Sequence, residues 1–220
     1  MDLASSGGGV YNFKMTDDFL TSLLGNQHRA RLLRLFVLNQ PQAFTKALAS
    51  KRAGVGAGVV GREIQALEKL GVLKKAKLSI QIGKGKRVVT GKQKEEAWVF
   101  DADFKYAPAL SKFLHEISPV QHKSILEALK GSGRLSALIL SGSFVGDLSR
   151  PADLIVAADA LNESRLDAAI RGFEPTLGRE IRYAVFTTPE FRYRLTIQDR
   201  LIRDTLDYPH FVLLDKERLL

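Results

Sequence analysis

The sequence predicts an α+β protein in which two dissimilar modules follow one another along the chain. Residues 17–100 have the pattern of short amphipathic helices followed by a two-stranded hairpin. Residues 134–220 alternate strands with helices, which is typical of a small α/β module. Residues 101–133 are predicted to be helices that connect the two modules, and residues 1–16 to be a flexible Gly/Ser-rich tail.

The charge is divided between the same two parts of the chain. Residues 1–100 hold 17 Lys and Arg against 7 Asp and Glu, whereas residues 101–220 hold 16 against 17, so the first part carries the whole net charge of +9. Such asymmetry favours a polyanion-binding module joined to a neutral one. The alternative is a solvated basic surface that only aids solubility.

The composition excludes several classes of site and of location. The chain of 220 residues is 45% hydrophobic and 26% charged, as expected for a globular protein. It contains no cysteine, which excludes disulfides, Cys-based zinc sites and thiol catalysis. The first 15 residues lack the pattern of a signal peptide, and no apolar run approaches the roughly 20 residues of a membrane span. We therefore expect a cytoplasmic protein.

The first module begins with helical patterns. Residues 17–39 predict two helical segments with a break at Gly25-Asn26. Residues 44–54 predict a short helix that ends at Gly54 and turns Leu48 inward.

Residues 55–73 predict a third helical region with two distinct faces. Val60, Ile64, Leu67 and Leu70 form an apolar stripe that is expected to face the core. The opposite face carries Val59, Gly61, Arg62, Gln65 and Lys69. Small residues would let this helix approach a DNA groove while the longer side chains reach base edges. The alternative is an ordinary solvated face of an amphipathic helix.

A basic hairpin follows. Residues 74–82 and 96–100 predict its strands, with Trp98 and Phe100 inward. The glycine-rich segment between the strands carries Lys84, Lys86, Arg87, Lys92 and Lys94. These cations are expected to contact phosphates, which adds affinity without sequence information.

The segments LLGNQHRARLLRLFVLN and GREIQALEKLGVL, followed by the hairpin, resemble winged helix-turn-helix transcriptional regulators of the ArsR/MarR-like type over about residues 19–100. The resemblance implies double-stranded DNA as a partner and, by analogy, a homodimer. It also implies a DNA-binding surface made of Thr45, Lys46, Val59, Gly61, Arg62, Gln65, Lys69, Lys84, Lys86 and Arg87.

The second module contains a Gly-Ser turn at the end of an apolar strand. Residues 134–144 predict this strand, residues 152–159 the next one, and Asp153 stands at the start of the second. The stretch SGSFVGDLSRPADLIVAAD resembles the entrance to the site of the nucleotidyltransferase superfamily that includes polymerase beta. The resemblance covers about residues 134–215 and makes Gly142, Ser143 and Asp153 candidate ligand-binding residues.

Active members of that superfamily carry a D-x-D pair and a third carboxylate on a later strand, which together hold two divalent cations. Here Pro151 stands at the first position of the pair, and residues 181–187 contain no acid. Asp147 and Asp159 lack the two-residue spacing that would place them on one strand face with Asp153. We therefore expect no catalysis, no metal and no cofactor in this half.

Two explanations of Asp153 remain open at this stage: it accepts backbone N–H groups of the 146–152 loop, or it keeps a role in binding a nucleotide or a single metal. The leading hypothesis for the chain is a sequence-specific transcriptional regulator whose degenerate second half senses a ligand, dimerises or docks a protein. The alternatives are an active, NTP- and Mg-dependent nucleotidyltransferase and an antitoxin-like interaction module.

Overall fold

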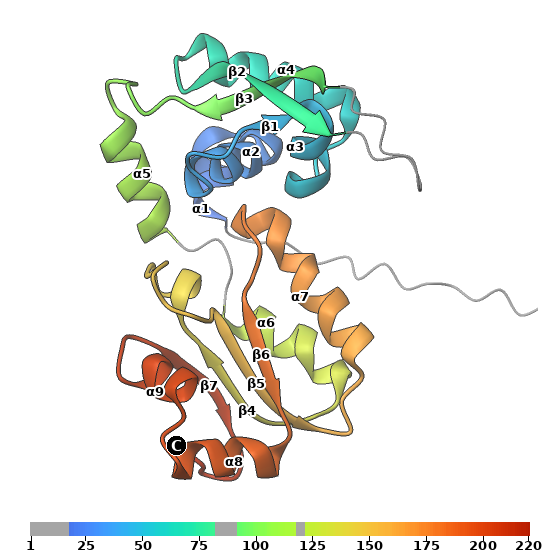
Figure 1. Ribbon diagram of the computed structural model, residues 1–220, viewed down its shortest axis with the longest axis vertical. Coiled ribbons are helices and arrows are strands. Elements are labelled where there is room, and N and C mark those ends of the chain that lie inside the picture. The colour runs from blue at the N-terminus through green and yellow to red at the C-terminus, as the bar shows by residue number, and fades with distance from the viewer. Residues whose placement is uncertain (1–17, 82–91, 118–121) are drawn as a thin grey trace, which may run out of the picture.

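The computed structural model describes residues 18–81, 92–117 and 122–220, which combine helices with two small sheets (Figure 1). The N-terminal half consists of α1 (Phe19–Leu24), α2 (Gln27–Leu38), β1 (Phe44–Thr45), α3 (Lys46–Ala53), α4 (Ala57–Lys69), β2 (Leu73–Gln81), β3 (Lys92–Phe100) and α5 (Ala107–Glu116). The C-terminal half consists of α6 (His122–Leu129), the 3₁₀ turn η1 (Lys130–Ser132), β4 (Arg134–Leu140), the 3₁₀ turn η2 (Gly142–Phe144), β5 (Leu154–Asp159), α7 (Glu163–Leu177), β6 (Tyr183–Phe186), α8 (Thr188–Thr196), α9 (Arg200–Leu206) and β7 (Phe211–Asp215). No helix in the described ranges is long and apolar enough to cross a membrane.

The helices of the N-terminal half begin and end at residues suited to those positions. The Asn26 side chain accepts the Arg29 N–H at the start of α2, and the Thr45 hydroxyl accepts the Leu48 N–H at the start of α3. Gly25 and Gly54 end α1 and α3 in the left-handed conformation. The predicted break at Gly25-Asn26 is confirmed.

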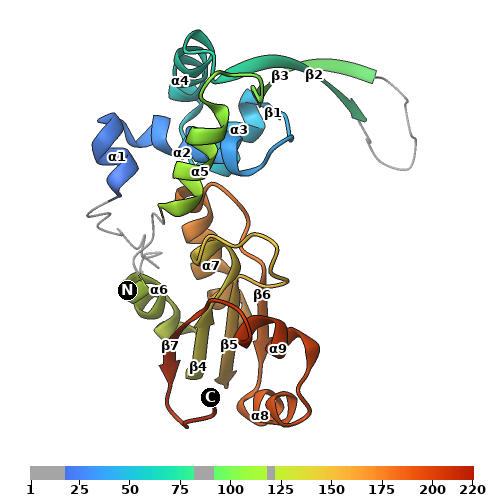
Figure 2. The ribbon, with the colours of Figure 1, turned by 90° about the vertical axis from the view of Figure 1, so that its left-hand side faces the viewer.

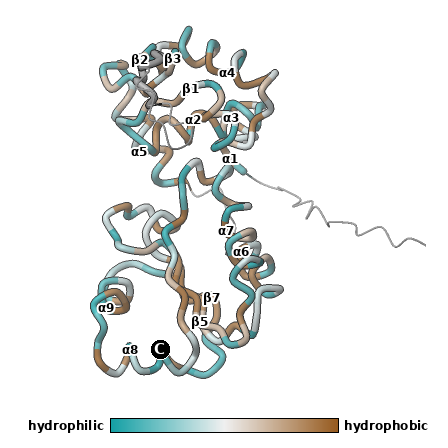
Figure 3. The backbone as a smooth tube through the Cα atoms, turned by 45° about the vertical axis from the view of Figure 1, so that its right-hand side comes forward, coloured by the Kyte–Doolittle hydropathy of each residue, from teal (hydrophilic) through white to brown (hydrophobic). Residues whose placement is uncertain are grey.

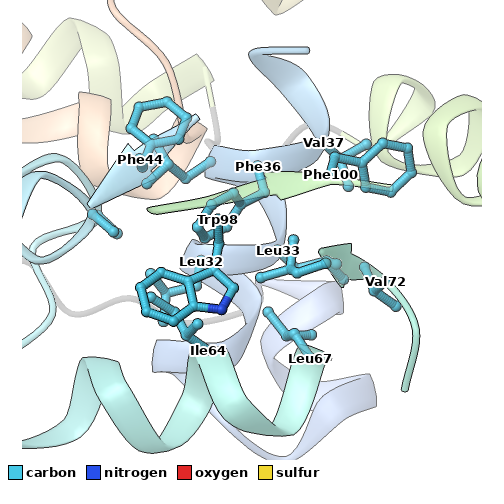
Figure 4. Packing of buried hydrophobic residues seen from close by; sticks show 14 of the residues in the cluster. Leu32, Leu33, Phe36, Val37, Phe44, Ile64, Leu67, Val72, Trp98 and Phe100 are labelled. Carbon is cyan, nitrogen blue, oxygen red and sulfur yellow. The ribbon is translucent and has the colours of Figure 1, made fainter. Parts of the chain in front are cut away.

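The sheet of this half has the strand order β1-β3-β2, and both pairings are antiparallel. Figure 2 shows β2 and β3 extending to one side beyond the helices. Trp98 and Phe100 are buried, as predicted, against side chains of α2 and α4 (Figure 4). Leu32, Leu33, Phe36, Ile64 and Leu67 belong to the same core.

Two leucines predicted to face this core lie outside it. Leu48 is 37% exposed because α3 buries the small residues Ala49 and Ala53 instead. Leu70 is 62% exposed because it is the C-cap residue, at the point where α4 ends and the chain turns.

The C-terminal half is built on a sheet with the order β6-β5-β4-β7, in which only the β5–β6 pair is parallel. One face of the sheet packs against α6 and α7, and the other packs against α8 and α9. The apolar strands run between these helical layers, as the brown segments of Figure 3 indicate. Burial on both faces explains why β4 and β5 are almost continuously apolar.

The residues predicted as a connector divide between the two halves. Ala107 and Leu114 of α5 are part of the first core, whereas Ile125 and Leu129 of α6 are part of the second. The halves also meet directly, because the C-terminal end of α7 contacts α2 and α3 (Figure 1).

Gly178, the residue after α7, makes this contact possible. It has a φ of +77°, and a Cβ atom there would lie 2.6 Å from the Arg34 Cβ and 2.8 Å from the Arg34 carbonyl carbon. The Asn39 side chain donates to the Gly178 carbonyl at 2.6 Å, and Arg52 pairs with Glu180. Glycine is therefore required at 178 both by its backbone conformation and by the close approach of α2.

Candidate nucleic-acid interface and the Gly-Ser turn

The outward face of α4 is open to solvent along its whole length. Arg62, Gln65 and Lys69 are exposed, as the helical pattern predicted. A Cβ on Gly58 would meet no atom within 4 Å, and one on Gly61 would meet only the end of the Lys46 side chain, at 3.9 Å. The first turns of α4 can therefore approach another surface at backbone distance.

Lys46 is placed next to this face by an aromatic contact. Its Nζ lies 5.1 Å from the centre of the Trp98 ring, and the Trp98 indole N–H donates to Glu68 at 3.1 Å. A cation above an indole ring is held by the negative potential of the ring face. The exposed Lys46 ammonium therefore adds positive charge beside Gly61.

Two of the predicted contact residues have other roles. Thr45 is buried, and its hydroxyl is occupied as the N-cap of α3. Val59 is half-buried and packs against the first core instead of standing on the open face. Lys84, Lys86 and Arg87 lie outside the described residues.

The cations around α4 and the hairpin differ in their partners. Lys74 binds Asp101 at 2.7 Å and Asp103 at 3.1 Å, and Lys75 binds Glu96 at 2.8 Å. These hydrogen bonds raise the pKa of both lysines. Within the described part of the chain, Lys51, Arg62, Lys69 and Lys77 form no ion pair.

A buried acid fixes α4 against α2, and the sequence pattern did not reveal its role. Glu63 is 5% exposed and accepts hydrogen bonds from the Asn26 side chain at 3.1 Å and from Arg29 Nε at 2.9 Å. The sequence did contain one indication of this burial, because Glu63 stands next to Ile64 on the face of the helix that turns toward the core. The two bonds hold α4 in a fixed position relative to α2.

The Gly-Ser turn of the C-terminal half surrounds the Asp153 carboxylate. Gly142 has a φ of +54°, and a Cβ there would overlap the Asp153 carboxylate and lie 2.9 Å from the Ala152 carbonyl oxygen. Both the conformation and the space therefore require glycine. The next residue, Ser143, donates its N–H and its hydroxyl to Asp153 Oδ1, each at 2.7 Å.

Asp153 is fully buried and has its remaining acceptor sites filled by Arg182. Arg182 donates its backbone N–H and its Nε to Oδ2 at 2.9 and 3.0 Å, and its Nη2 to Oδ1 at 2.9 Å. Burial alone would raise the pKa of Asp153, but the hydrogen bonds from Arg182 and Ser143 hold it below its ordinary value. Of the two explanations left open for Asp153, hydrogen bonds from backbone N–H groups of the 146–152 loop are wrong, because the donors are Ser143 and Arg182, the residue before β6.

The predicted site residues thus form two separate groups. Lys46, Gly61, Arg62, Gln65 and Lys69 lie together on the N-terminal half, whereas Gly142, Ser143 and Asp153 meet at the turn of the C-terminal half. Comparisons of the chain with models of protein families, with curated proteins and with solved structures found no match.

The two acids nearest to Asp153 in sequence have local partners of their own. Asp147 accepts the N–H and the hydroxyl of Ser149 at 3.0 and 2.6 Å, and Asp159 accepts the N–H and the hydroxyl of Thr188 at 3.1 and 2.8 Å. These hydrogen bonds lower the pKa of both carboxyl groups. Across residues 18–81, 92–117 and 122–220, no three His, Asp or Glu side chains are grouped so that they could hold a metal ion.

Proposed function

We propose that this protein is a sequence-specific, DNA-binding transcriptional regulator with a non-catalytic C-terminal half. The observation that carries the proposal is the outward face of α4, where Arg62 and Lys69 are exposed and form no ion pair within the described residues. The element order α2-β1-α3-α4-β2-β3, together with the strand order β1-β3-β2, supports a winged helix-turn-helix arrangement.

In this arrangement α4 enters the major groove of a duplex. Arg62 has the donor geometry that suits guanine, and Gln65 can bind adenine through its amide. The exposed Lys46, Lys69 and Lys77 are suited to the phosphates on either side. Gly58 and Gly61 allow the helix backbone to come close to the edges of the bases.

The contacts of Asp153 support a non-catalytic C-terminal half. The hydrogen bonds to this carboxylate come from Ser143 and Arg182. The Arg182 guanidinium therefore supplies the positive charge that balances Asp153. Pro151 offers no ligand at the position where active transferases carry their first acid. The C-terminal half then serves as a module for sensing, docking or dimerisation.

The proposal includes a homodimer, since two copies match two half-sites on a duplex. Apolar surface is available for such a contact on α1, where Phe19 is 57% exposed and Leu23 is 59% exposed. Light scattering of the purified chain should give twice the mass of 24.4 kDa.

Selection from a random duplex library, followed by fluorescence anisotropy at several salt concentrations, tests DNA binding directly. We expect an enriched sequence whose affinity falls steeply, by at least about ten-fold, between 50 and 200 mM salt. Arg62→Gln should weaken binding of the selected duplex by about ten-fold and relax its sequence preference.

Arg165→Gln is the matched control, since it removes from α7 one exposed cation that also has no ion pair among the described residues, and it should leave binding unchanged. Absence of duplex binding at low salt, or an affinity that does not respond to salt, would refute the proposal.

A further inference from the structure

A small cleft lies between the two halves of the molecule. Its walls come from α2, from α5, from the loop after β4 and from the end of α7. The lining residues are Arg34, Leu38, Leu114, His115, Ile117, Ser143, Gly146, Leu148, Leu177 and Arg179. None of these lining residues is acidic, whereas two are arginines.

Arg179 brings a half-buried guanidinium without an ion pair among the described residues to this cleft. Its Nε and Nη1 atoms are buried and have no hydrogen-bond partner among the described residues. Burial lowers the pKa of the Arg179 guanidinium, with the Asp153 charge acting in the opposite direction. Desolvated N–H groups of a charged side chain are costly to leave unpaired, so a ligand that accepts hydrogen bonds is expected here.

The other cationic groups of the region are already neutralised. Arg34 donates to both oxygens of Asp18 at 2.6 and 2.8 Å, and Arg182 is paired with Asp153. The Ser143 hydroxyl donates to Asp153 as well. The buried Arg34 Nε is a further donor without a partner among the described residues.

Three buried guanidinium nitrogens, Arg179 Nε and Nη1 and Arg34 Nε, therefore lie unpaired beside the cleft, together with one charge that no acid lining the cleft balances. A phosphate group matches this set, because it carries close to two negative charges at pH 7 and several acceptor oxygens. A group held there would contact α2 and α7, which belong to different halves.

We propose that the cleft between the halves binds a phosphate group, free or carried by a nucleotide, through Arg179 and Arg34. Because the site is defined by both halves, its occupancy favours their present arrangement by mass action. The inference is independent of DNA binding, since none of the lining residues belongs to the α4 face.

Isothermal titration of the full chain with inorganic phosphate and, separately, with ATP in EDTA tests the proposal. Ionic strength is held constant with sodium chloride, so that general screening does not imitate binding. We expect saturable binding of one ligand per chain. Equal affinity for both ligands identifies the phosphate group alone as sufficient, and at least ten-fold tighter binding of ATP identifies a nucleotide as its carrier.

Three variants locate the binding. Arg179→Gln should weaken it at least ten-fold while the chain keeps its circular dichroism spectrum. Arg171→Gln removes an exposed cation of α7 that does not line the cleft. This variant should bind like the parent chain. Arg62→Gln should also bind phosphate normally. Weaker binding by this variant would instead place the phosphate on the α4 face.

Hydrogen exchange of the unmodified protein gives a readout that needs no variant. Ligand should protect amides in residues 142–148 and 177–179 and leave α4 unchanged. The proposal is overturned if neither ligand saturates, if Arg179→Gln binds as tightly as the parent, or if protection falls on α4 instead.

Discussion

Residues 1–100 and residues 101–220 hold almost the same number of cationic side chains, 17 and 16, but very different numbers of acidic ones, 7 and 17. In the second part most surface arginines have an acidic partner on the same or an adjacent element, as in Arg171–Asp167, Arg192–Glu217, Arg194–Glu190, Arg200–Asp204 and Arg203–Asp207. In the first part Lys51, Arg62, Lys69 and Lys77 have none among the described residues. The second part also has cations without an ion pair among the described residues, such as Arg134, Arg165 and Arg218, so the two parts differ in net charge because they hold 7 and 17 acids.

Inside the molecule the two halves are alike. Each contains one arginine–aspartate pair with a fully buried carboxylate or guanidinium: Arg34 with Asp18, and Arg182 with Asp153. These pairs are non-local in sequence and fix the position of a chain segment. The following predictions test how far surface pairs and buried pairs differ in their consequences.

The largest effect is expected from breaking the Arg34–Asp18 pair. The Arg34 side chain is 1% exposed, so Asp18→Ala leaves a buried charge without its partner and should lower the free energy of unfolding by about 3–5 kcal/mol. Urea unfolding monitored by circular dichroism measures the change. Asp167→Ala, which breaks an exposed pair with Arg171, should have no measurable effect on stability.

The double variant Asp18→Leu with Arg34→Met should recover most of the loss, because apolar side chains of similar volume need no partner. Equal effects of Asp18→Ala and Asp167→Ala would contradict the distinction between buried and surface pairs.

The next largest effect is expected at the boundary between the halves. Gly178→Ala introduces a left-handed alanine and a clash with Arg34, which together should cost at least about 2 kcal/mol. Gly172→Ala lies within the same α7 sequence, where a Cβ meets no atom within 4 Å, and should stabilise by up to about 1 kcal/mol. Thermal unfolding compares them, and a stable Gly178→Ala chain would contradict the tight contact of α7 with α2.

A smaller, pH-dependent effect is expected from Asp153. Its folded-state pKa lies below the ordinary value of about 3.9, so its ionised form contributes stability above about pH 5 that is lost as the pH falls through the folded pKa. Asp153→Asn should therefore reduce stability at pH 7 and flatten the decline of stability in acid. Asp207→Asn, on an exposed pair with Arg203, is the control. An unchanged acid decline in Asp153→Asn would exclude this linkage.

Local signals in the sequence were sufficient for some element boundaries and not for others. The strand β1 lies inside the helix predicted at 44–54, and β3 begins at Lys92, so Lys92 and Lys94 lie in a strand and not in the predicted turn segment. The Gly25-Asn26 break, the end of α3 at Gly54 and the inward positions of Trp98 and Phe100 depend on capping and periodicity within a few residues. The errors at Leu48 and Leu70 have the same local origin, because periodicity does not tell whether a neighbouring element reaches that part of the helix.

The contacts of the candidate sites could not be predicted in the same way. Arg182 lies 29 residues from Asp153 and reaches it through the parallel pairing of β5 and β6, which helical or strand periodicity does not specify. The same holds for Arg34 with Asp18 and for the cleft, whose walls come from four segments. Thr45 was assigned wrongly for a different reason: a threonine directly before a helix is a natural N-cap, and this local role was overlooked when Thr45 was predicted to contact DNA.

The smallest effect is expected on duplex affinity, when a paired and an unpaired lysine of the same strand are substituted. Lys77 faces Glu96 across the β2–β3 pair, but the Glu96 carboxylate binds Lys75, which leaves Lys77 without an ion pair among the described residues. Lys77→Gln should weaken duplex binding by about three- to ten-fold and reduce the salt slope by about one.

Lys74→Gln should change both quantities by less than half as much, because Lys74 is held by Asp101 and Asp103 and must leave them to reach a phosphate. Anisotropy titrations of both variants at four salt concentrations give the two slopes. Equal slopes would mean that the pairing of surface lysines does not decide which of them bind DNA.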